Sequence, residues 1–186
     1  ILGSAFFLEG FEVQDAPRYG AERRGAPIFA YVRASRQTIN ERGIIHHPDL
    51  VVVADDSLVP IPAAGVLQGL DAHTLTLINS HTSAADWQQR LNLAGTVLIL
   101  PAMEEVADRA ELPFVGTTCA GAAARLVGVI SRDALAGAIQ AELGALGAQL
   151  VEKNTARALH DYDLMEPHAG SVTEGKAHSA GDYARP

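Results

Sequence analysis

The chain has 186 residues, of which 48% are hydrophobic and 19% charged, and its formal net charge is −8 at pH 7. This length predicts one domain with a substantial core, and the acidic balance excludes a general nucleic-acid binder, which needs a basic face. The single cysteine, Cys119, excludes an internal disulfide framework and a cysteine-ligated iron–sulfur cluster in this chain, and it is typical of the reducing cytoplasm. No apolar run approaches the roughly 20 residues that span a bilayer, so no membrane association is predicted.

The first hundred residues predict mainly strands. Residues 1–9 predict a short helix, and residues 10–27, rich in glycine, proline and charge, predict a loop. The unbroken apolar run at 50–54 is typical of a central parallel strand covered on both faces. Strands are predicted, in chain order, at residues 28–35, 50–54, 75–78 and 97–100, with a helix at 84–93.

The second half of the chain predicts mainly helices, and Ser131 with Asp133 is a plausible N-terminal cap for one of them. Strands followed by helices predict an α/β layered domain with a largely parallel sheet flanked by helices. We assign this domain to residues 1–164. Residues 165–186 hold too few apolar groups to fold alone and predict an extended tail, either disordered or an arm on another subunit. Helices are predicted at residues 102–110, 117–129, 131–146 and 151–162.

A basic loop at residues 19–27 precedes the strand predicted at 28–35. It combines glycines, which free the backbone, with guanidinium groups suited to carboxylates and phosphates. Six of the fourteen Lys and Arg residues lie in or near it, opposed only by Glu22 and Glu41. Such a local positive patch suits an anionic small molecule or an acidic partner surface; pairing with acids of neighbouring subunits is equally open. The six are Arg18, Arg23, Arg24, Arg33, Arg36 and Arg42.

Polar side chains lie at the carboxyl ends of two of the predicted strands, at the sheet edge where α/β domains usually bind ligands. Asn79 and Ser80 are the better ligand-binding candidates, because amide and hydroxyl groups satisfy polar ligands without a charge cost. Asp55 and Asp56 either touch a ligand or, as we favour, cap the next turn. We expect Cys119 to be a small packed side chain rather than a nucleophile. The seven histidines are not spaced as metal ligands are.

Several motifs resemble the gamma subunit, or gamma domain, of the 2-oxoacid:acceptor oxidoreductases, the family that includes pyruvate:ferredoxin oxidoreductase. Family members carry a Tyr-Gly-x-Glu-x-Arg-Gly loop and then a strand ending in Val-Arg-x-Ser. The similarity continues at residues 48–55, 77–80, 120–123 and 151–154. The family's initial strand and Gly-x-Gly-Gly-Gln-Gly loop have no counterpart here, so we expect the sequence to be part of a longer one. The matching positions are Tyr19, Gly20, Glu22, Arg24, Gly25, Val32, Arg33 and Ser35.

The resemblance implies a non-catalytic subunit of a cytoplasmic complex that converts a 2-oxoacid and CoA to acyl-CoA and CO2. It places thiamine diphosphate, Mg²⁺ and [4Fe-4S] clusters in partner subunits of alpha, beta and delta type, with ferredoxin or an NAD-linked acceptor receiving the electrons. This chain is expected to contribute assembly and part of the CoA path. Tyr19, Gly20, Glu22 and Gly25 would shape the loop, and no catalytic or metal-binding residue is expected. The residues expected to bind the cofactor are Arg18, Arg23, Arg24, Asn79 and Ser80.

Two other functions stay open at this stage. Indolepyruvate-type oxidoreductases carry a related domain with a Gln-Arg-Gly-Gly loop, whereas Glu22-Arg23-Arg24-Gly25 favours the pyruvate-type branch. A free-standing nucleotide-binding α/β protein is the second alternative, disfavoured by the missing glycine loop and by the tail. The 2-oxoacid itself is open among pyruvate, 2-oxoglutarate, branched-chain and aryl oxoacids.

Overall fold

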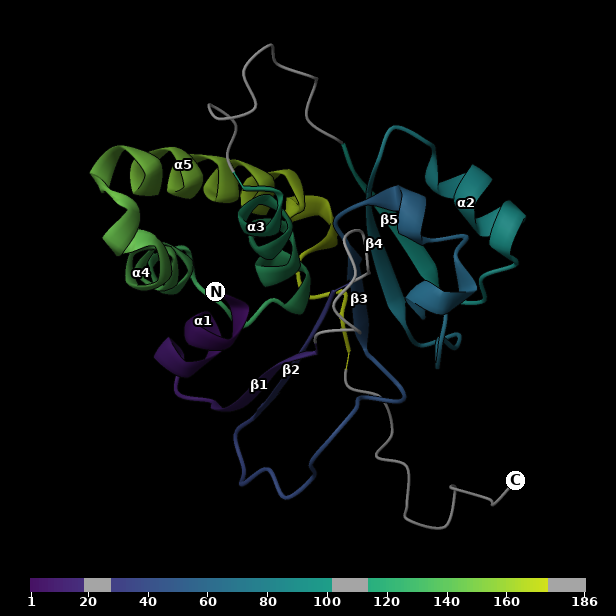
Figure 1. Ribbon diagram of the computed structural model, residues 1–186, viewed down its shortest axis with the longest axis horizontal. Helices are drawn as coiled ribbons and strands as arrows, with labels where there is room; N and C mark the ends of the chain where they lie inside the picture. The colour runs from purple at the N-terminus through teal and green to yellow at the C-terminus, as the bar shows by residue number, and fades with distance from the viewer. Residues whose placement is uncertain (19–27, 102–113, 174–186) are drawn as a thin grey trace.

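The computed structural model describes residues 1–18, 28–101 and 114–173 (Figure 1). Its sheet and its helices form layers, with a separate two-stranded ribbon beside them. The elements in chain order are α1 (Leu2–Leu8), β1 (Glu12–Arg18), β2 (Phe29–Ser35), β3 (Leu50–Val53), β4 (Leu75–Ser80), α2 (Ala84–Leu91), β5 (Thr96–Pro101), α3 (Val115–Val127), α4 (Arg132–Leu143) and α5 (Ala148–Leu164).

The sheet has three parallel strands in the order β3-β4-β5, which confirms the predicted α/β layering. The prediction that residues 50–54 form the central strand is wrong, because β3 pairs only with β4 among the described strands. Only Val53 of β3 is buried, whereas Leu77 and Ile78 of β4 are fully buried. An unbroken apolar run indicates that both faces of a strand are covered, and this holds at an edge as well as at the centre.

Helices cover both faces of the sheet, with α2 on one side and α3 and α5 on the other (Figure 1). Because side chains alternate along a strand, neighbours in β4 reach different cores. Leu77 packs in one cluster with Leu126 of α3. Ile78 packs in another cluster with Trp87 of α2. The sheet is therefore the shared wall between two apolar layers.

The predicted loop at 10–27 is wrong over Glu12–Arg18, which forms β1 and pairs antiparallel with β2. Glu12 lies opposite Ser35, and Arg18 lies opposite Phe29. A charged strand containing a proline is tolerated in such a two-stranded ribbon, where each strand keeps an unpaired edge. The rest of the predicted loop, 19–27, and the predicted helix at 102–110 lie outside the described residues.

The three remaining helices of the second half are confirmed as α3, α4 and α5. Ser131 caps α4 as predicted, since its Oγ accepts a hydrogen bond from the Ala134 N–H at 3.1 Å. Together with α1 these helices enclose a third core cluster, rich in small side chains, which includes Leu135, Ile139 and Tyr162. Within the described ranges no helix is both long enough and apolar enough to traverse a membrane.

The first residues of the predicted tail pack on this domain. Met165 is 4% exposed and Val172 lies against the same cluster, between the sheet and α3. The N–H groups of Gly170 and Val172 donate to the Arg125 and Leu126 carbonyls at 3.1 and 3.0 Å. Residues 165–173 therefore donate to carbonyls in the last turn of α3, where a helix leaves acceptors without intrahelical partners. The rest of the predicted tail, 174–186, lies outside the described residues.

Gly121 marks the closest approach of α3 to α5 and provides a test of this packing. A Cβ atom added there would lie 2.1 Å from the Ala158 carbonyl oxygen, whereas one added at Gly116 in the same helix meets nothing within 4 Å. We expect Gly121→Ala to lower the free energy of unfolding in urea by about 1–3 kcal/mol, because the helices must separate. Gly116→Ala, the matched control, should be neutral or stabilising by up to about 1 kcal/mol. Equal stability of the two variants would contradict the close approach.

Candidate functional site

The carboxyl ends of β3 and β4 meet the first residues of α3 at one edge of the sheet, where ligands bind in α/β domains. A depression of about 410 Å³ lies there, and a second of about 480 Å³ adjoins it beside β5 and the start of α2. Both are lined by Ser80 and His81. The first is lined in addition by Ala54, Asp55, Asp56, Asn79 and Val115. The polar residues that the sequence placed at the strand ends thus share one edge.

Ser80 is only 1% exposed, and its hydroxyl group is fully used within the chain. It donates to Asp56 Oδ2 at 2.5 Å and accepts from the Thr82 N–H at 3.0 Å and from Trp87 Nε1 at 3.1 Å. A hydroxyl group has one donor and two acceptor sites, so none is left for a ligand. Ser80 thereby joins β4 to the turn after β3 and to α2, while the cofactor contact predicted for it stays a prediction.

Asn79 and Asp55 are also engaged locally, though less completely. The Asn79 amide donates to the Ala54 carbonyl at 2.9 Å, while its Oδ1 has no hydrogen-bond partner among the described residues. Asp55 Oδ1 accepts from the N–H and the hydroxyl of Ser57 at 3.0 and 2.7 Å. Asp55 therefore caps the turn that follows β3, as we favoured from the sequence. Asn79 keeps one free acceptor on the wall of the depression.

Two arginines of the predicted basic patch, Arg33 and Arg36, contact other residues of their own chain. Arg33 donates to the carbonyls of Gly43 and Ile44 at 2.9 and 3.0 Å and thereby holds the loop after β2. The Arg36 guanidinium lies 4.2 Å from the centre of the Phe11 ring. Arg18 is the last residue of β1.

The rest of the predicted loop site cannot be placed beside these residues, because Arg23 and Arg24 lie outside the described ranges. The same holds for Tyr19, Gly20, Glu22 and Gly25, which we expected to shape that loop.

Cys119 is buried in α3 against the sheet, which confirms the predicted packed residue. Burial, and to a smaller degree the charge of Asp161, raise the pKa of the thiol to about 11. The helix start therefore does not activate this cysteine, because removing a thiolate from water outweighs any help from the helix dipole. At neutral pH the side chain is a neutral thiol. The described residues contain no cluster of His, Cys, Asp and Glu placed to hold a metal ion.

Two buried polar residues of α5 were not singled out from the sequence. Asn154 is fully buried, with Oδ1 accepting from the Phe114 N–H at 2.8 Å and Nδ2 donating to the Leu150 carbonyl at 2.9 Å. Asp161 is fully buried as well and accepts a hydrogen bond from Arg157 Nε at 2.9 Å. The available signal was their spacing, because both follow the inward positions of the helix at Val151 and Ala158.

Comparison with known proteins places these features in a family. Residues 1–163 match the family model of pyruvate ferredoxin/flavodoxin oxidoreductase. The chain is 33% identical over 167 residues to the pyruvate/ketoisovalerate oxidoreductases common subunit gamma of Pyrococcus furiosus, with 89% of this chain and 88% of that protein aligned. It is 32% identical over 171 residues to pyruvate synthase subunit PorC of Methanothermobacter marburgensis, with 91% and 89% aligned.

A solved structure shows the same fold. The crystal structure of pyruvate oxidoreductase subunit PORC from Thermotoga maritima superposes with a TM-score of 0.70 at 24% sequence identity. The superposition covers 87% of this chain and 84% of that one.

The three hydrogen bonds of Ser80 predict a structural role that can be measured. Ser80→Ala leaves the indole N–H of buried Trp87 and the Thr82 N–H without their acceptor, so we expect the free energy of unfolding to fall by about 1–3 kcal/mol. Trp87 is the sole tryptophan of the chain, and its fluorescence reports unfolding in urea. Ser57→Ala, at an exposed hydroxyl on the same edge, should stay within about 0.5 kcal/mol of the wild type. A Ser80→Ala variant as stable as the wild type would contradict this role.

Proposed function

The chain belongs to the pyruvate ferredoxin/flavodoxin oxidoreductase family, and from this premise we propose that it is the gamma-type subunit of a 2-oxoacid:acceptor oxidoreductase. The complex converts a 2-oxoacid and CoA to acyl-CoA and CO2 in the cytoplasm. The observation that carries the proposal is similarity along nearly the whole length of proteins named as gamma or PorC subunits, with 88% and 89% of two of them aligned.

The chemistry of this chain supports placing the redox cofactors in partner subunits. A cysteine-ligated cluster needs several thiolates, and these 186 residues contain one cysteine, whose pKa is raised to about 11 by burial. Thiamine diphosphate, Mg²⁺ and the [4Fe-4S] clusters are accordingly held by subunits of alpha, beta and delta type. Those subunits pass electrons to ferredoxin or to an NAD-linked acceptor.

The role of this chain is assembly, together with part of the CoA path. One relative is named as a gamma subunit common to pyruvate and ketoisovalerate oxidoreductases, so that protein serves enzymes for two different 2-oxoacids. By extension, the choice of 2-oxoacid by this chain's complex lies in other subunits. The internal use of Ser80 and Asp55 supports the same division, since these side chains hold elements of the chain together.

Isolation of the native complex tests this proposal. The chain, tagged and purified from its own host, should co-purify with further subunits at several times its own mass of 19.6 kDa. That complex should reduce a viologen dye when given a 2-oxoacid, CoA and thiamine diphosphate. The isolated chain should reduce none, because its only thiol is buried and protonated. Turnover by the isolated chain, or a native protein that is a lone monomer, would refute the proposal.

The arginine loop allows a second test within the complex. We propose that Arg24, the family-matched position, pairs with Glu22 or a backbone carbonyl to hold the loop, while Arg23 faces CoA or a partner subunit. Charge-assisted hydrogen bonds of this type are worth roughly 1.5–3 kcal/mol. Arg23→Ala should therefore raise the KM for CoA, or weaken the complex, by about ten- to a hundredfold.

Arg24→Ala is the matched comparison, and it should lower the melting temperature of the chain. Unchanged CoA kinetics and unchanged assembly in Arg23→Ala would show that the loop is a solvated surface outside the CoA path.

A further inference from the structure

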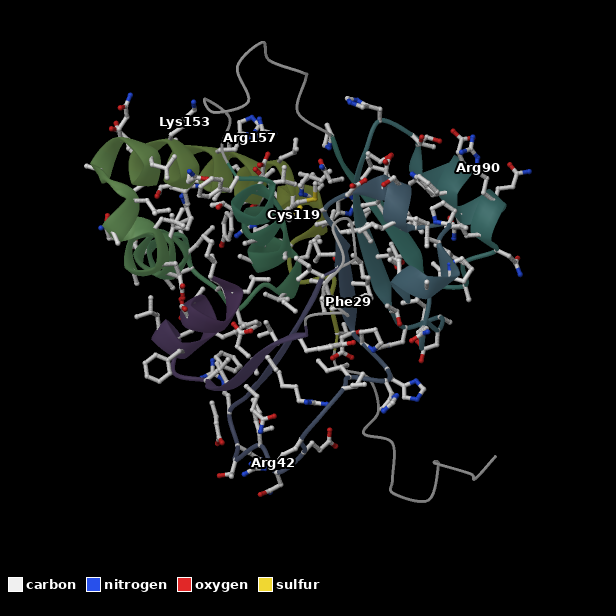
Figure 2. The ribbon with its side chains drawn as sticks, in the orientation of Figure 1. Phe29, Arg42, Arg90, Cys119, Lys153 and Arg157 are labelled. Carbon is white, nitrogen blue, oxygen red and sulfur yellow. The ribbon has the colours of Figure 1, made fainter. Side chains whose placement is uncertain are left out.

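A row of basic side chains lies on the outer face of α5. Lys153, Arg157 and His160 follow one another at spacings of four and three residues, which places them on one face of the helix. Figure 2 shows Lys153 and Arg157 along the edge of α5 that points away from α4. Lys153 is exposed and makes no ion pair within the described ranges. In this α5 basic row the Arg157 guanidinium is already paired with Asp161, so Lys153 supplies its outward-facing charge.

A buried carboxylate beneath the row, Asp161, contacts the side chains of Arg157 and His160 and orients them. Asp161 is fully buried, with Oδ2 accepting from Arg157 Nε at 2.9 Å and Oδ1 lying 3.1 Å from His160 Nδ1. Burying a carboxylate is costly, and a negative charge in the last turn of a helix opposes the helix dipole. Asp161 therefore serves to hold its two neighbours in place. The terminal nitrogens of Arg157 have no partner among the described residues, and the His160 side chain is 64% exposed.

The row continues into an apolar surface at the start of α3. Phe114 is 44% exposed and Val115 is 37% exposed. The hydrogen bond from the Phe114 N–H to Asn154, the residue after Lys153, joins the start of α3 to the turn of α5 that carries the basic row. The basic and apolar groups thus lie on segments that a partly buried hydrogen bond holds together.

We infer that the α5 basic row, together with Phe114 and Val115, is the docking surface for an acidic segment of a partner subunit that also carries an apolar anchor. The inference rests on the proposed function, because the partner is another subunit of the oxidoreductase. Val115 also lines one of the two depressions at the sheet edge, but neither depression includes a residue of α5. Small ligands occupy concave sites, whereas a helix surface with an exposed positive charge beside held basic side chains fits a protein segment of opposite charge.

Cross-linking in the native complex tests the inference directly. Lys153 is one of only two lysines in the chain, so its products are readily distinguished. A carbodiimide, which joins a lysine amine to a carboxylate in direct contact, should link Lys153 to an Asp or Glu of a partner subunit, as identified by mass spectrometry. Lys153→Arg should lose this product while the complex assembles normally, because the positive charge remains.

Charge reversal supplies the second measurement. Lys153→Glu should weaken assembly about tenfold or more at low salt, since it brings like charges together. The affinity of the wild type should fall as ionic strength rises, and that of Lys153→Glu should depend less on salt. Arg90→Glu is the matched control, an exposed charge reversal on α2 at the other side of the molecule (Figure 2), and it should leave assembly unchanged.

The outcomes separate this inference from the proposed function. A complex that forms equally well with Lys153→Glu, and in which Lys153 gives no cross-link, overturns the docking surface and leaves the subunit assignment standing. A Lys153→Glu complex that assembles normally but has a raised KM for CoA assigns the row to a small anionic ligand and also overturns it. A wild-type chain that recruits no partner subunit overturns both.

Discussion

The close packing of α3 between the sheet and α5 is the constraint on which the rest of the structure depends. No side chain from Gly116 to Ala124 is larger than threonine, and all of them except Gly116 are buried. Cys119 and Ala122 face the sheet, whereas Ala124 belongs to the helical core. A helix in contact on opposite sides must be apolar around its whole circumference, and small side chains let both neighbours approach.

Segments distant in the chain secure both ends of this central helix. Asn154 of α5 accepts the N–H of Phe114 at its start, and Gly170 and Val172 donate to carbonyls at its end. Helix ends leave backbone groups unpaired, so a buried helix needs such partners. The contact at the start has a second effect, because it sets the apolar residues Phe114 and Val115 beside the basic row of α5. The same hydrogen bond thus serves the fold and the proposed docking surface.

At the sheet edge that commonly binds ligands, much of the polar capacity is used to hold elements together. Ser80 satisfies the indole of Trp87 and binds Asp56, which joins the end of β4 to α2 and to the turn after β3. Asn79 retains one acceptor that no described residue uses, and His81 is exposed. Polar groups committed in this way agree with the architectural role proposed for the chain.

The sequence alone determined the layered α/β class, the family and most of the regular elements, because these depend on local patterns. The apolar runs of β4 and β5, the cap of α4 at Ser131 and the apolar spacing of α5 are all readable over a few residues. The family motifs are likewise contiguous. Local signals of this kind require no knowledge of which segments meet.

Only the tertiary structure decided which segments pair and which polar groups remain free. The charged sequence of β1 predicts a loop, and only its pairing with β2 makes it a strand. The apolar sequence of β3 predicts a central strand, and only the strand order shows that β4 is its single neighbour among the described strands. Ser80 looks available in the sequence, yet partners from three places in the chain use its hydroxyl group completely. Each of these depends on contacts between distant residues, which a pattern along one chain does not encode.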